Sequence, residues 1–233
     1  PIQVAAARTS GYATAAATLA LLRTGRLRGT VIGPDGSAGT LVERSREDGF
    51  RYALQIPAAY DPARPWPLLV TLHGANAGAD TAAGRTWIQT WLRCPRAREE
   101  AILLAPTTTR HTWSARPAHQ AVLDALRDLQ RELNIDPDRI HVDGMSMGGG
   151  GAFRLAEHLP DRWASIGPRC NVPDVRQKRD GTLVTMLAEN LRNVPVYWVV
   201  GAKDEKIPVA FARAARDAFQ AAHVDCVYRE FPD

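Results

Sequence analysis

The sequence has 233 residues, of which 45% are hydrophobic, and its formal net charge is +4 at pH 7. A chain of this length and apolar content can bury a large core as a single globular domain. The basic residues are nearly all arginines and are scattered along the chain, which argues against a nucleic-acid-binding surface. Cys94, Cys170 and Cys226 are too widely spaced for a metal or redox pair and predict no disulfide framework, although they leave room for one bridge.

The first 28 residues form an N-terminal segment of unclear role. Their apolar run, at 12–22, is far too short to cross a bilayer and has no obvious cleavage site after it. We expect an amphipathic or packing helix there, and no stretch elsewhere reaches the length of a membrane span. Because the chain begins at Pro1 without a methionine, a preceding signal peptide would not be visible.

From residue 50 onward, strand-like and helix-like patterns alternate along the chain. Residues 50–57 alternate like a half-exposed strand, whereas 67–73 and 101–106 are continuous apolar runs, typical of strands buried on both faces. The pattern then predicts a helix at 119–133, strands at 140–144 and 195–201, a helix at 208–223 and a last strand at 226–231. Strands separated by such helices favour a mostly parallel sheet covered on both faces.

The stretch IHVDGMSMGGGGAF, at 140–153, contains G-x-S-x-G between a predicted strand and a predicted helix. This context is the one that a nucleophile elbow requires, with Ser146 on a sharp turn. Gly144 and Gly148 leave room where the strand and the helix pass close together, and the free N–H groups of the helix face the serine oxygen. No lysine follows the glycines and G-x-G-x-x-G fits in no register, so a phosphate loop and a dinucleotide site are set aside.

From about residue 50 to its end, the chain resembles the α/β-hydrolases, and within them the polyhydroxybutyrate depolymerase-like and feruloyl esterase-like esterases. The resemblance is carried by residues 52–78, 134–153 and 197–209, in the family's order. It implies an α/β-hydrolase domain over 29–233, with a mostly parallel central sheet and helices on both faces. It also implies a catalytic triad that needs no cofactor or metal, and an ester substrate. The location is left open, although the resemblance favours a secreted or periplasmic one.

The resemblance assigns an oxyanion hole to two backbone N–H groups. One belongs to Ala75, in the loop after the strand that ends at His73-Gly74, and the other belongs to Met147, directly after the nucleophile. Two fixed donors of this kind stabilise the developing alkoxide, and the loss of one costs about 3 kcal/mol. We expect His73 to shape the loop through hydrogen bonds and Gly74 to allow close backbone approach.

The acid of the triad is expected in GAKDEKIP, after the strand at 195–201. The resemblance implies that Asp204 orients the catalytic histidine, with Glu205 as the second choice in the same loop. The alternative is that Asp204 is a solvated charge paired with Lys203 or Lys206.

The base is harder to assign, because family order requires a histidine after the acid and only His223 follows Asp204. His223 precedes the last strand, so about 20 Å of strand separates it from the edge where Ser146 and Asp204 are expected. The same geometry removes His141 and His158. We therefore expect the domain to be truncated before its catalytic histidine, with the natural protein continuing past Asp233.

Three residues are expected at the edge of the sheet where Ser146 and Asp204 lie: His111, His119 and Trp113. They are candidates for the substrate pocket, with Trp113 as a wall for an acyl or aromatic group; the alternative is that they are ordinary loop residues. The sequence thus predicts a carboxylic ester hydrolase that forms an acyl-enzyme on Ser146. A peptidase or thioesterase of the same fold, and a binding protein that has lost its base, remain the alternatives. The particular ester and the oligomeric state are left open.

Overall fold

The computed structural model describes residues 27–32, 38–46, 48–75, 83–108, 112–185 and 187–232. The helix predicted at 12–22 and the pocket residue His111 lie outside the described residues. The domain boundary expected between 28 and 29 falls inside the first described strand, β1 (Leu27–Ile32).

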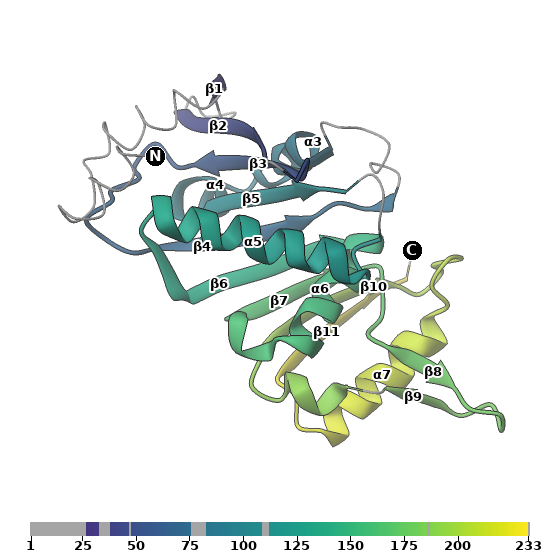
Figure 1. Ribbon diagram of the computed structural model, residues 1–233. Coiled ribbons are helices and arrows are strands. Elements are labelled where there is room, and N and C mark those ends of the chain that lie inside the picture. Colours follow the sequence, from purple (N-terminus) through teal and green to yellow (C-terminus); the bar gives the residue numbers. More distant parts are fainter. Residues whose placement is uncertain are drawn as a thin grey trace.

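A nine-stranded sheet runs through the described part of the chain in the order β1-β2-β3-β5-β4-β6-β7-β10-β11 (Figure 1). Its strands after β1 are β2 (Ala38–Ser45), β3 (Arg51–Ile56), β4 (Trp66–Leu72), β5 (Ile102–Thr107), β6 (Ile135–Met145), β7 (Ser165–Arg169), β10 (Val196–Gly201) and β11 (Cys226–Phe231). The first three pairings are antiparallel, and all those from β5 to β11 are parallel. A separate hairpin joins β8 (Val175–Gln177) to β9 (Leu183–Thr185).

Helices lie on both faces of the sheet, as Figure 1 shows. One face carries α5 (Arg116–Glu132), α6 (Met147–His158) and α7 (Val209–Ala221), and the other carries α3 (Ala83–Trp91) and α4 (Pro95–Glu100). Short 3-10 turns at Pro160–Arg162 and Ala188–Leu191 complete the described helices. None of the helices in the described ranges combines the length and the apolar character needed to cross a membrane.

The core is divided by the sheet into two layers. On the α5–α7 side, Phe153 of α6 packs edge-on against Trp198 of β10, with ring centroids 5.2 Å apart. On the α3 side, Ile88 packs with Leu41 and Leu103. The large layer fixes α6, and with it the start of that helix, against the parallel strands.

Most of the predicted elements are confirmed, with ends shifted by a few residues, but the exposure predicted for residues 50–57 is wrong. Residues 52–56 are all buried. Leu54 joins the core layer on the α5 side and Ala53 joins the layer on the α3 side, so β3 is covered on both faces. The sequence did not predict strand β7, because Gly167 and Pro168 interrupt its apolar pattern.

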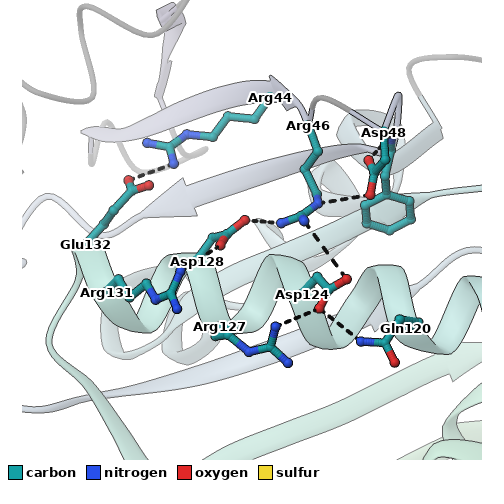
Figure 2. Close-up of polar contacts among 10 residues, drawn as sticks. Arg44, Arg46, Asp48, Gln120, Asp124, Arg127, Asp128, Arg131 and Glu132 are labelled. Atoms are coloured by element: carbon teal, nitrogen blue, oxygen red, sulfur yellow. Dashed lines mark hydrogen bonds and ion pairs between the residues drawn. The ribbon is translucent and has the colours of Figure 1, made fainter. Parts of the chain in front are cut away.

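A network of ion pairs joins β2 and the turn after it to α5 (Figure 2). Arg44 Nη1 lies 2.7 Å from Glu132 Oε2, and Arg46 binds Asp128 and Asp48. Each such pair, partly exposed, contributes no more than about 1 kcal/mol. The network nevertheless fixes the antiparallel end of the sheet to the helix that crosses its parallel part.

Candidate active site

Ser146 occupies the single-residue turn between β6 and α6. Its backbone has φ 54° and ψ −120°, a conformation that side-chain-bearing residues rarely adopt. Such strain costs about 1–3 kcal/mol and persists only where the surrounding structure enforces it. This is the strand–turn–helix geometry of a nucleophile elbow.

The glycines around Ser146 are required by close approaches of backbone to backbone. A Cβ on Gly144 would lie 2.2 Å from the carbonyl oxygen of Gly148, and one on Gly148 would lie 2.1 Å from that of Leu72. A Cβ on Gly149 would lie 2.5 Å from the Arg169 carbonyl oxygen. The steric role predicted for Gly144 and Gly148 is confirmed.

Both peptide groups of Ser146 are held by the end of strand β7 and the residues directly after it. The Ser146 N–H donates to the carbonyl oxygen of Arg169 at 2.8 Å, and Asn171 Nδ2 donates to the Ser146 carbonyl oxygen at 2.7 Å. Sequence reasoning missed these residues because it missed β7. A strand between the helix that ends near residue 158 and the strand at 195–201 could have been predicted, because strands and helices alternate in a parallel sheet.

Arg169 is itself fixed on the α3 face of the sheet. Its guanidinium forms an ion pair with Asp143 of β6 and lies 5.2 Å from the ring centroid of Trp91. Trp87 Nε1 and Trp91 Nε1 both donate to Thr71 Oγ1, at 2.6 and 2.7 Å. Burial raises the pKa of Asp143 to about 6, against the lowering effect of Arg169. The ion pair of Asp143 and Arg169 therefore lies next to the elbow, on the α3 face of the sheet.

The loop after β4 comes close to the nucleophile. A Cβ on Gly74 would lie 3.6 Å from Ser146 Cβ, and the next residue, Ala75, is exposed. Met147 is the first residue of α6, where backbone N–H groups have no partner within the helix. Of the two residues predicted for the oxyanion hole, Ala75 thus follows the loop residue nearest Ser146, and Met147 directly follows Ser146 in the chain.

His73 holds this loop in place. Its Nε2 accepts a hydrogen bond from the Thr108 N–H at 3.1 Å, so the ring proton is on Nδ1, which donates to the Gly74 carbonyl oxygen at 2.8 Å. Burial lowers the pKa of His73 from its ordinary value, which favours the neutral ring. With both nitrogens engaged, His73 has the shaping role expected from the sequence and cannot act as the base.

The prediction that Trp113 forms a wall of the substrate pocket is wrong. Its side chain is 0% exposed, and its Nε1 donates to the His73 carbonyl oxygen at 2.8 Å. Its Cβ also fills the space beside Gly151, where an added Cβ would lie 2.4 Å away. Trp113 therefore supports the loop after β4 and the start of α6 from inside the core.

Asp204 lies in the loop after β10, the position that the sequence analysis assigned to the acid. Its Oδ1 accepts hydrogen bonds from the backbone N–H groups of Lys206 and Ile207, at 2.9 and 3.0 Å. Glu205 is exposed. Asp204 also acts electrostatically on Cys170, whose thiol pKa is raised by burial and then by this carboxylate. Since Cys170 precedes Asn171, the carboxylate and the elbow flank the same segment.

None of the five histidines in the described residues is placed to act as the base. His73 is excluded by its hydrogen bonds, and His141 lies at the opposite edge of the sheet, bonded to Ser165 Oγ at 2.8 Å. His223 follows α7, three residues before β11, whose first residue pairs with Val196 at the start of β10. The other two pack together: His119 of α5 lies 6.4 Å, between ring centroids, from His158 at the far end of α6.

A pocket of about 330 Å³ opens beside the elbow. It is lined by Thr112 and Ser114, by Met147, Gly150 and Arg154 of α6, and by residues 171–175. Arg154 Nη1 binds Asp174 Oδ2 at 2.9 Å. Behind this pair lies Glu157, which is fully buried and whose pKa is raised by that burial. The lining is thus polar, with its charges paired.

The sheet order and the elbow define a protein of the α/β-hydrolase fold. No protein-family profile matches the sequence. Feruloyl esterase C of Emericella nidulans is 30% identical over 112 residues, which are 47% of this chain and 42% of that protein. A bifunctional acetylxylan esterase/xylanase of Neocallimastix patriciarum is 25% identical over 77% of this chain and 26% of its own length. The chain therefore spans less than half of these relatives.

Solved structures agree with this fold. A thermostable esterase superposes with a TM-score of 0.68 over 87% of this chain and 61% of its own, at 23% identity. A mutant feruloyl esterase module from Clostridium thermocellum, complexed with sinapinate, superposes with a TM-score of 0.66 over 88% and 85%, at 14% identity. These identities show the fold alone. The chain thus has the α/β-hydrolase fold, and about half of its sequence is similar to feruloyl esterases.

Proposed function

We propose that this domain belongs to a serine carboxylic ester hydrolase that forms an acyl-enzyme on Ser146. The observation that carries the proposal is the strained backbone of Ser146, at φ 54°, in the turn between strand β6 and helix α6. A strained serine turn surrounded by obligatory glycines has no evident structural use, whereas nucleophilic catalysis requires it.

In the proposed reaction, Ser146 Oγ attacks the carbonyl carbon of the ester while a base takes its proton. The oxygen that becomes negative is stabilised by the N–H groups of Ala75 and Met147, and Asp204 orients and stabilises the protonated base. The alcohol leaves with that proton, and water then releases the acid by the same steps in reverse order. Because the five described histidines are unsuitable, the base is His111 or a residue outside this sequence.

The substrate class follows from the similarity to enzymes named feruloyl esterase, and a hydroxycinnamate ester is the first substrate to test. The pocket beside Met147 is large enough for such a group, since ligand pockets start at about 300 Å³. Its paired charges and hydroxyl groups suit a polar ester better than a long alkyl chain.

A fluorophosphonate probe tests the nucleophile. In a protein that includes the base, we expect covalent labelling at Ser146, detected by peptide mass spectrometry, and no labelling of Ser146→Ala. Ser114→Ala is the matched control, because Ser114 lines the same pocket without occupying the elbow. Labelling that persists in Ser146→Ala and disappears in Ser114→Ala would show that Ser146 is not the nucleophile. Turnover of methyl ferulate against the matching amide and thioester then separates an esterase from a peptidase or thioesterase.

A further inference from the structure

The Ser146 carbonyl oxygen is held by two donors of unequal strength. Asn171 Nδ2 donates to it at 2.7 Å, whereas the first helical bond of the turn, from the Gly150 N–H, measures 3.1 Å. Because this carbonyl group belongs to Ser146 itself, the strained ψ angle of Ser146 sets the direction in which the carbonyl points. The short bond from Asn171 therefore acts directly on the torsion that aims the serine.

Asn171 is fixed in place before it reaches Ser146. Its Oδ1 accepts from the Val172 N–H at 2.7 Å, and its own carbonyl oxygen accepts from Trp198 Nε1 at 2.8 Å. Because Oδ1 is occupied by a donor, the amide can present only Nδ2 to the Ser146 carbonyl. Trp198 is fully buried, so Asn171 is anchored to the core of the sheet.

The chain approaches the elbow here through a second strained residue. Cys170 has φ 51°, and its N–H donates to the Val199 carbonyl oxygen at 2.8 Å. This conformation turns the chain at the end of β7, so that the Arg169 carbonyl and the Asn171 side chain both face Ser146. Gly150 then leaves the space that the amide fills, since a Cβ there would lie 3.0 Å from Asn171 Nδ2.

We propose that Asn171 is a positioning residue for the nucleophile, holding the Ser146 carbonyl so that Oγ points at the ester carbon. This inference rests on the proposed function. Asn171 acts through the backbone of Ser146 and touches no reacting atom. Loss of its donor lets ψ of Ser146 relax, and displacement of a reactive group by about 1 Å can cost a hundredfold in rate.

Asn171→Asp tests the proposal, because it keeps the shape and the acceptor for Val172 but replaces the donor with an oxygen. Asn190→Asp is the matched control: Asn190 Nδ2 donates to the Glu157 carbonyl oxygen at 2.7 Å, near the other end of the same helix. The readouts are the melting temperature, the maximal rate of fluorophosphonate labelling and the probe concentration that gives half that rate. We expect similar losses of stability in both variants. Only Asn171→Asp should label more slowly, by roughly tenfold to a hundredfold, with its half-saturating concentration nearly unchanged.

Hydrogen exchange of the Ser146 amide separates this proposal from the proposed function. If the unmodified protein labels and Asn171→Asp labels as fast as Asn190→Asp, the positioning role is wrong. If an unmodified protein that includes the base does not label, the proposed function fails, and amide exchange decides the positioning role. The Ser146 N–H, bonded to Arg169, should then exchange faster in Asn171→Asp than in Asn190→Asp. Equal exchange would overturn the proposal.

Discussion

The backbone N–H of Ser146 donates a hydrogen bond of 2.8 Å to the carbonyl oxygen of Arg169, the last residue of the neighbouring strand β7. Through this bond the nucleophile turn continues the parallel pairing of β6 with β7 by one residue. Arg169 in turn is bound by Asp143, three residues before Ser146. The elbow is therefore enforced by the sheet as well as by its own glycines.

Replacement of Gly148 by alanine should be far more damaging than replacement of Gly150. The new Cβ of Gly148→Ala would lie 2.1 Å from the Leu72 carbonyl oxygen, whereas that of Gly150→Ala meets only the Asn171 side chain, at 3.0 Å. We expect a loss of at least about 3 kcal/mol or failure to fold for the first. For the second, a change within about 1 kcal/mol is expected. Urea unfolding of both variants measures the difference, and equal stabilities would contradict the close-approach argument.

Asp204→Asn should slow labelling and turnover by orders of magnitude without altering the circular dichroism spectrum. The amide keeps an oxygen for the Lys206 and Ile207 N–H groups but no longer stabilises a protonated base. The exposed Glu205 supplies the control, since Glu205→Gln should have little effect on either rate. The reverse pattern would make Glu205 the acid.

His73→Phe should lower stability by about 2 kcal/mol, because it removes two hydrogen bonds and leaves the Thr108 N–H and the Gly74 carbonyl without the ring. His141→Phe, which loses a bond to a serine hydroxyl at the other edge of the sheet, is the control. Burial lowers the pKa of His73 from its ordinary value, so the folded state binds fewer protons at this ring than the unfolded state does. The contribution of the ring to stability is therefore present above the ordinary pKa and is lost as the pH falls through the lowered one. Thermal melts between pH 5 and 8 should show a slope that His73→Phe reduces.

Asp143 should give the opposite pH dependence. Its pKa is about 6 in the folded protein and 3.8 as the ordinary value, so the folded state binds more protons between these limits. The contribution of Asp143 to stability is therefore present below about pH 4 and lost as the pH rises through 6, by about 3 kcal/mol at most. The stability of the protein minus that of Asp143→Asn, measured by urea unfolding, should fall across this range. A difference that is constant with pH would place the pKa of Asp143 near its ordinary value.

The sequence by itself determined the elements that local pattern specifies. The continuous apolar runs before His73 and Pro106 predicted strands of the parallel sheet, and the glycines around Ser146 predicted a close strand–helix crossing, because steric demands at a turn restrict residue type locally. The position of Asp204 after a strand followed from the same alternation. These predictions needed no knowledge of distant contacts.

Only the tertiary structure decided which side chains support the site. Trp113 looked like a pocket residue because an aromatic side chain in a loop carries no sign of its own burial, and the packing of α6 against it placed it inside. Asn171 gave no signal, since an asparagine after an irregular strand is ordinary in a loop. Its hydrogen bond to Ser146 depends on the pairing of β7 with β6, a contact between residues 25 positions apart, which local sequence does not encode.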